Sequence, residues 1–360
     1  MMFRELLMPN LISKTFGASA GSLRLPLIGL YGFLILANLA AWAWAVVLFE
    51  HQPIILGTAL IAYTLGLRHA VDADHIAAID NVTRKLMQEG KRPVSIGFFF
   101  ALGHSTVVAI AAAVIAVATT ALTGRFEQLK SVGEVTSTLI SASFLFVIAF
   151  ANLGILRSIW KTFHHVRAGG QFIDDDFNLL LNGRGVMARI FRPMFKVVSR
   201  SWHMFPLGFL FGLGFGTATE VTLLGLSAAQ VSNGVSIWSI MVFPALFAAG
   251  MSLIDTTDGV LMLGAYNWAF IKPMRKLYYN LTITFVSVVV AFLIGGIETL
   301  ELIGGQFALS GWFWEGIAAL NENFNSLGFV IIGVFISAWV ASIVIYRYHG
   351  LDEIDARAGR

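Results

Sequence analysis

Long apolar stretches, separated by short polar segments, run through most of the chain. A helix needs about 20 apolar residues to cross the hydrocarbon core of a lipid bilayer. Eight stretches meet this requirement, and they lie at residues 27–49, 54–79, 96–122, 135–156, 204–229, 241–270, 278–303 and 327–348. The pattern therefore predicts an all-α polytopic membrane protein with eight transmembrane helices.

Lysine and arginine are concentrated in alternate connections between these stretches. If both termini are cytoplasmic, 21 of the 24 Lys and Arg residues lie on the cytoplasmic side, and only Arg125 and Lys130 lie outside. Such a bias sets the orientation of membrane helices. The sequence thus predicts two groups of four helices, joined by a cytoplasmic loop and flanked by cytoplasmic ends. The predicted parts are 1–26 (N-terminal segment), 27–156 (helices 1–4), 157–203 (loop), 204–348 (helices 5–8) and 349–360 (tail).

The composition agrees with a lipid environment and limits the chemistry. The chain is 57% hydrophobic and only 12% charged, whereas soluble domains carry about 25% charged residues. The net charge of +3 gives no indication of a nucleic-acid partner, and none is expected. The chain has no cysteine, which excludes disulfides and thiolate ligands, so any bound metal must be held by nitrogen and oxygen atoms.

The second apolar stretch contains an unusually polar segment, "RHAVDADHIAAIDN". If the helix is continuous, His69, Asp72 and His75 lie within an arc of about 120° on one face. Asp80 lies nearly in line with His69, and Asp74 faces a different neighbour. This spacing predicts two imidazoles and a carboxylate on one helix face, with a second carboxylate beside them.

Such a cluster needs an internal partner, because each charged side chain at the bilayer centre costs roughly 2.5–3.5 kcal/mol. Three explanations are open: an ion-pair network anchored by Arg68, a proton relay, or a divalent-cation site. One arginine cannot satisfy two aspartates and two histidines. Imidazole nitrogen combined with carboxylate oxygen suits Ni, Co, Zn or Mn ions. The pattern therefore favours a divalent transition-metal site.

The segment "RHAVDADHI" also contains His-x4-Asp-His, formed by His69, Asp74 and His75. It resembles the signature of the second transmembrane helix in the NiCoT family of nickel/cobalt permeases. The resemblance continues in "GFFFALGHSTVV", "LGFGTATE" and "GMSLIDTTDGVLM". It implies a multi-pass carrier of the bacterial cytoplasmic (inner) membrane that takes up Ni²⁺ or Co²⁺ as its substrate, not as a cofactor. It also implies that the three motif residues are central to transport.

Polar residues in other stretches extend the expected site. His104 in the third stretch lies at a similar depth to His69, and Glu220 and Asp255 are acids within apolar stretches. The expected metal ligands are His69, Asp72, Asp74, His75 and His104. The residues expected to support transport around them are Arg68, Asp80, Thr217, Thr219, Glu220, Asp255 and Asp258. Glu298, near the outer end of the seventh stretch, is expected to lie at a solvated rim.

Glycines mark the fifth stretch. Gly208, Gly212 and Gly216 recur every four residues, a spacing that lets another helix approach closely. At Gly216 the sequence departs from the family pattern, which usually has Asp there. One carboxylate of the family is therefore missing, which bears on metal preference, affinity and the neutralisation of the site.

Two other functions compete with uptake. Family members that export metal tend to carry His-rich soluble segments, which are absent from this chain. His-x4-Asp also occurs in membrane acyltransferases, where the Asp orients a histidine base. The adjacent His75 and the position within a transmembrane stretch argue against an enzyme. The sequence therefore predicts a transporter and no catalytic residues.

Overall fold

The computed structural model describes residues 20–118, 123–167, 198–213, 218–232, 234–269 and 273–348, and these contain helices but no strand. The predicted all-α class is confirmed. The helices are α3 (Ala20–Phe49), α4 (Pro53–His69), α5 (Ala73–Gln88), α6 (Ile96–Ala118), α7 (Thr123–Arg167), α10 (Met204–Gly212), α11 (Ala218–Ser232), α12 (Ile237–Ile240), α13 (Val242–Ala269), α14 (Pro273–Gln306), α15 (Trp312–Glu322) and α16 (Phe324–Tyr348), with a 3₁₀ turn at Ser201–His203.

Several of these helices can cross a membrane. Five are long and apolar enough by themselves, and the count rises to seven if each of two bent helix pairs forms one crossing. The bent pairs are α4 with α5 and α15 with the first part of α16. The chain is therefore a multi-pass membrane protein by length and composition of its helices.

The predicted second crossing is broken. Helix α4 ends at His69, α5 begins at Ala73, and their axes differ in direction by 50°. Asp72 adopts an extended conformation at the start of α5. Gly328 of α16 packs so closely against Val71 in the break that an added Cβ would overlap the Val71 carbonyl. The prediction of one continuous helix over 54–79 is therefore wrong.

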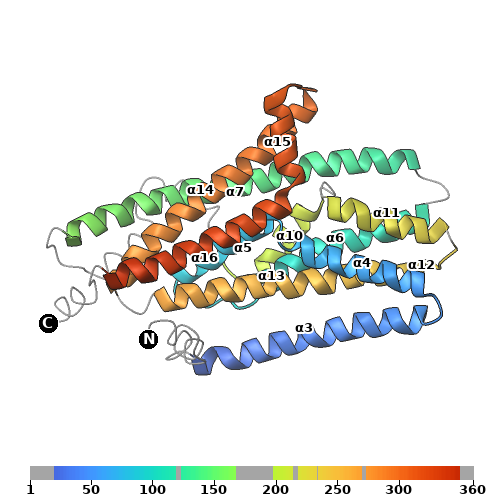
Figure 1. Cartoon of the computed structure of the whole chain (residues 1–360), viewed down its shortest axis with the longest axis horizontal. Helices are drawn as coiled ribbons and strands as arrows, with labels where there is room; N and C mark the ends of the chain where they lie inside the picture. The colour runs from blue at the N-terminus through green and yellow to red at the C-terminus, as the bar shows by residue number, and fades with distance from the viewer. Residues whose placement is uncertain are drawn as a thin grey trace.

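A second interruption lies in the stretch predicted at 204–229. Helix α10 ends at Gly212 and α11 begins at Ala218, while residues 214–217 lie outside the described part of the chain. Helix α4 packs against α13 and α11, and α6 packs against α10 and α13. Figure 1 shows the ends of α4, α5, α10 and α11 meeting in the middle of the bundle. Four helix ends therefore lie in the interior of the molecule.

Other helix bounds differ from the prediction. Helix α5 continues to Gln88, so Arg84 and Lys85, expected in a loop, are helical. Helix α7 continues to Arg167, into the predicted loop at 157–203. Helix α15 was not predicted, and Figure 1 shows it projecting beyond the other helices. Residues 168–197 and 349–360 lie outside the described part of the chain.

The predicted close helix approach at the glycines is confirmed for two of them. A Cβ added to Gly208 would overlap the Phe100 carbonyl of α6, and one added to Gly212 would lie 3.0 Å from the His104 carbonyl. On α6, a Cβ added to Gly103 would overlap the Phe205 carbonyl of α10. Backbone contact between α6 and α10 therefore sets the position of His104.

We expect Gly208→Ala to destabilise the protein, because the new methyl group forces α10 away from α6. Overpacking of this kind costs about 1–3 kcal/mol. Gly225→Ala is the matched control, since nothing lies within 4 Å of a Cβ at this position in α11. Alanine there raises helix propensity by up to about 1 kcal/mol. Thermal unfolding of the purified variants in detergent measures both effects, and equal midpoints for the two variants would contradict the packing account.

Candidate metal site

Three histidines converge where the broken helices meet. His69 is the last residue of α4, His75 lies in the first turn of α5, and His104 lies in the middle of α6. All three side chains are buried, with at most 3% of their surface exposed. One nitrogen atom from each ring can be chosen so that all three lie within 4.8 Å of one another. The rings surround a common point in the interior of the bundle.

Carboxylates fix the orientation of two of these rings. Asp72 Oδ2 lies 2.8 Å from His69 Nδ1, and Asp255 Oδ2 lies 3.2 Å from His75 Nδ1. A carboxylate accepts a hydrogen bond, so each Nδ1 donates its proton and the lone pair is left on Nε2. His75 Nε2 is buried and has no hydrogen-bond partner among the described residues. Both rings are therefore held in the tautomer that binds a metal through Nε2.

Glu220 brings a further carboxylate to the centre of the cluster. It lies in the first turn of α11, and its Oε1 is 2.8 Å from His104 Nε2 and 4.0 Å from His69 Nε2. The two Nε2 atoms of His69 and His104 are 2.9 Å apart. Thr219, the preceding residue, lies 3.0 Å from His69 Nδ1 through its hydroxyl oxygen. The N-terminus of α11 thus supplies an acid and a hydroxyl group to the site.

Helix dipoles favour negative charge at this position. The N-termini of α5 and α11 both lie at the site, with Asp72 and Asp74 at one and Glu220 at the other. The N-terminal end of a helix carries about +0.5 elementary charge, which stabilises a nearby carboxylate. The arrangement therefore places carboxylates beside imidazoles, the donor set that suits a divalent transition metal.

Aromatic rings close the site on two sides. Phe247 of α13 lies 5.5 Å from His69, and Phe100 of α6 lies 4.8 Å from His75, measured between ring centroids. Both phenylalanines are fully buried. No sequence signal distinguishes these two residues, because phenylalanine is common throughout the apolar stretches. They form a dry wall that strengthens electrostatic interactions inside the site.

The predicted single helix face is wrong in its geometry. The break at residues 70–72 places His69 and His75 on different helices, and their rings nevertheless lie only 4.7 Å apart between centroids. Asp72 turns back onto His69, so it orients the ring in this structure. Asp80, expected in line with His69, lies further along α5 and takes part in a separate network.

Asp74 lies apart from the contacts that join the histidines. Its Oδ1 is buried and has no hydrogen-bond partner among the described residues. Its carboxylate lies near that of Glu298 of α14, and two negative charges at these positions would repel each other. Glu298 is buried, with 6% of its surface exposed, and accepts a hydrogen bond from Ser141 of 2.9 Å. The expectation that Glu298 lies at a solvated rim is wrong, because α14 packs closely against α7 along this part of its length.

A second buried network continues from the site along α5. Tyr266 donates a hydrogen bond of 2.6 Å to one oxygen of Asp80, and Ser287 donates one of 2.8 Å to the other. Asn81 accepts hydrogen bonds from Arg84 and Asn152, both of 2.8 Å. The sequence did not indicate these partners, which come from α7, α13 and α14.

The remaining predicted residues separate into three cases. Asp258 lies one turn beyond Asp255 on α13, and its Oδ2 is buried without a partner among the described residues. Arg68 is exposed, so it does not anchor a buried ion-pair network, and the buried arginine of this region is Arg84. Thr217 and Gly216 lie outside the described part of the chain.

The sequence matches one protein family over most of its length. Residues 55–345 match NicO, described as high-affinity nickel-transport protein. The chain is 59% identical to the high-affinity nickel transport protein of Cupriavidus necator, over 94% of this chain and 97% of that protein. It is 42% identical to the nickel transporter NicT of Mycobacterium tuberculosis, over 90% and 89% of the two chains. No solved structure matches the chain.

One relative is named for a different metal. The chain is 40% identical to the cobalt transport protein NhlF of Rhodococcus rhodochrous, over 81% of this chain and 82% of that protein. These relatives are named as transport proteins, in agreement with the prediction of a transporter.

Proposed function

The chain belongs to the NicO family of high-affinity nickel-transport proteins, as the motif resemblance predicted, and on this premise we propose that it takes up Ni²⁺ or Co²⁺ through the buried histidine site. His69, His75 and His104 bind the ion. Asp72 and Asp255 orient two of the rings, and Glu220 contributes negative charge at the centre. The metal is the transported substrate.

The main support for this proposal is the convergence of three buried imidazoles from three helices. A buried imidazole that only stabilises the fold needs a partner for both nitrogens, whereas His75 Nε2 has none among the residues described. The carboxylates of Asp72, Asp255 and Glu220 offset the 2+ charge of an ion, which would otherwise be costly in a region of low dielectric constant.

The Nε2 atoms of two rings are close enough together to bind one ion. Two nitrogens each about 2.05 Å from a metal, at an angle of 90°, are about 2.9 Å apart. The Nε2 atoms of His69 and His104 are separated by 2.9 Å.

The broken helices support alternating access to this site. Discontinuous helices form the substrate sites of many secondary transporters, near the middle of the membrane. Here α4 and α11 lie on one side of the site, and α5 and α10 lie on the other (Figure 1). Movement of one pair of half-helices relative to the rest opens the site to one side of the membrane at a time.

The proposed topology has eight crossings in the bacterial cytoplasmic membrane, with both termini in the cytoplasm. The pair α10 and α11 supplies one crossing beyond the seven that the helix lengths allow. Figure 1 supports an even number of crossings, because the start of α3 and the end of α16 lie at the same end of the molecule. In this topology the sequence assigns 21 of the 24 Lys and Arg residues to the side of the termini, which favours a cytoplasmic location for that side.

Uptake by cells that express the protein tests the proposed function. We expect saturable accumulation of radiolabelled Ni²⁺, Co²⁺ or both above cells that carry an empty vector. Proteoliposomes loaded with a metal-sensitive dye then separate uptake from export. Absence of accumulation for both metals, with the protein present in the membrane, would overturn the proposal.

A further inference from the structure

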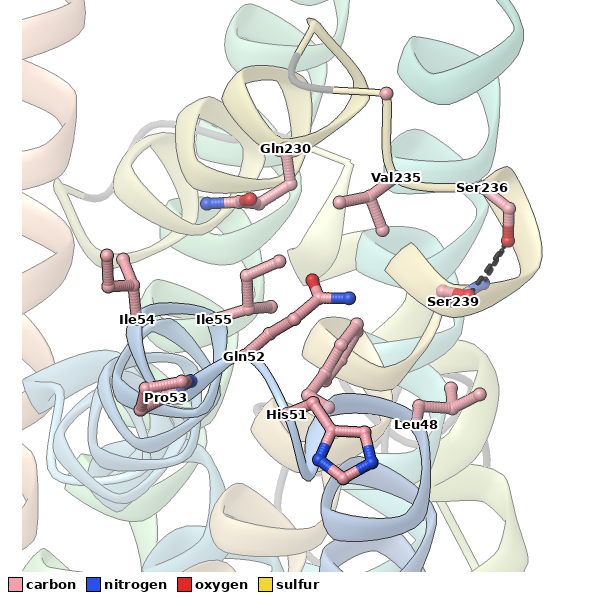
Figure 2. A pocket seen from close by; sticks show the side chains of 12 residues that line it. Leu48, His51, Gln52, Pro53, Ile54, Ile55, Gln230, Val235, Ser236 and Ser239 are labelled. Atoms are coloured by element: carbon pink, nitrogen blue, oxygen red, sulfur yellow. Dashed lines mark hydrogen bonds between the residues drawn. The ribbon is translucent and has the colours of Figure 1, made fainter.

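A cavity of about 650 Å³ lies at the end of the molecule opposite the start of α3 and the end of α16. Its walls come from the connection between α3 and α4, the end of α11 and the short helix α12. Figure 2 shows the amides of Gln52 and Gln230 and the hydroxyls of Ser236 and Ser239 around this space. In the proposed topology, this cavity opens to the outside of the cell.

The cavity suits a hydrated cation. Six water molecules occupy about 180 Å³ at about 30 Å³ each, so a hexahydrated ion fits with room to spare. The polar atoms on the wall are amides, hydroxyls and the imidazole of His51, all of which can bond to the water shell of an ion. The exposed carboxylate of Glu50 lies 3.3 Å from the imidazole of His51.

One face of α11 connects this cavity to the histidine site. Gln230, Ser227, Leu223 and Glu220 lie within an arc of about 80°, at 100° per residue, and all four are buried. Glu220 touches the histidines and Gln230 lines the cavity, about 15 Å apart along the helix axis. Leu223 is the single apolar side chain among the four.

Helix α4 packs against both α13 and α11, and its Gly66 lies against the Phe247 carbonyl of α13. Its buried residues between the cavity and His69 are Thr58, Ala59, Ala62 and Gly66, all small. Leu223 packs in the same hydrophobic cluster as Ala59 and Ala62. A shift of α11 relative to α4 that displaces Leu223 from this cluster, which also contains Phe243 and Phe247 of α13, would open a path from the cavity towards the site.

We propose that the cavity is an outer binding site for the hydrated divalent cation, and that the ion reaches the histidines between the outer half-helices α4 and α11. This inference rests on the proposed function. Leu223 closes the path in this structure, and Ser227 lies one turn nearer the cavity, fully buried, with its hydroxyl bonded to the Leu223 carbonyl. The ion loses its water at Leu223, where donors change from amides and hydroxyls to imidazoles and carboxylates.

The absence of cysteine in the chain permits a direct test. Three single substitutions exchange one oxygen for sulfur: Ser239→Cys in the cavity wall, Ser227→Cys on the path, and Ser310→Cys as a control. Ser310 is exposed in the connection between α14 and α15 and does not line the cavity. A cationic, membrane-impermeant methanethiosulfonate reagent is added outside, and uptake of radiolabelled Ni²⁺ and Co²⁺ is measured before and after.

We expect the reagent to remove most of the uptake of Ser239→Cys and Ser227→Cys, and to leave wild type and Ser310→Cys unchanged. Excess Ni²⁺ should slow the reaction of Ser227→Cys. Labelling of Ser239→Cys without loss of uptake, or labelling of Ser227→Cys from the cytoplasmic side alone, would overturn the proposed route. Failure of unmodified wild type to accumulate either metal would instead overturn the proposed function.

Discussion

Replacing His75 with alanine should abolish uptake of Ni²⁺ and Co²⁺. The ring is buried, its Nδ1 is held by Asp255, and its Nε2 has no partner in the described part of the chain. Removal of a residue that only orients a ligand typically costs about 10–100-fold in metal affinity, and removal of a ligand costs more. Metal binding to the purified variant in detergent, together with uptake by cells, measures this loss.

Two further variants separate metal binding from folding. His164→Ala is the matched control, because His164 is exposed on α7 and lies against Trp160, away from the site. Asp255→Asn keeps the size of the side chain and removes the charge that orients His75, so we expect an intermediate loss of affinity. Wild-type uptake by His75→Ala, at equal membrane abundance, would remove His75 from the site.

Replacing Glu220 with glutamine should weaken metal binding strongly while the fold persists. Glutamine keeps the shape of the side chain and one oxygen that can accept a hydrogen bond from His104, so the main loss is the negative charge. A pair of unit charges 4 Å apart interacts with about 4 kcal/mol at an effective dielectric constant of 20. We therefore expect a decrease in affinity of at least about a hundredfold.

The control for this variant is Glu315→Gln, which removes a charge from an exposed position in α15. Equilibrium binding of Ni²⁺ and Co²⁺ to both purified variants gives the comparison, with thermal unfolding as a check on folding. Equal affinities for Glu220→Gln and wild type would show that the charge of Glu220 does not act on the ion.

Hydrophobic patterning predicted the helices well because lipid requires long apolar runs. It failed at the break after His69, where the sequence "HAVD" has neither glycine nor proline. That break depends on tertiary structure: Asp72 turns back onto His69, and Gly328 of α16 packs against the Val71 carbonyl. Gly328 is more than 250 residues away in the sequence, so no local pattern could indicate this contact.

Some residues of the site are unusual in a transmembrane sequence, and others are not. Histidines and acids are conspicuous in apolar stretches because of their cost in a membrane, and this identified His104, Glu220 and Asp255. Tyr266 and Ser287, which hold Asp80, carry no such signal, since hydroxyl groups are common in transmembrane helices. Arg84 was assigned to a loop because the end of α5 is polar, although its side chain is buried.

X-ray absorption spectroscopy of the purified protein loaded with one equivalent of Ni²⁺ tests whether the three histidines bind the metal. We expect a first shell with imidazole nitrogens of His69, His75 and His104 at about 2.0–2.1 Å, and weaker imidazole scattering in His75→Ala. A shell of oxygen atoms alone, unchanged in that variant, would contradict binding of the metal by the three histidines.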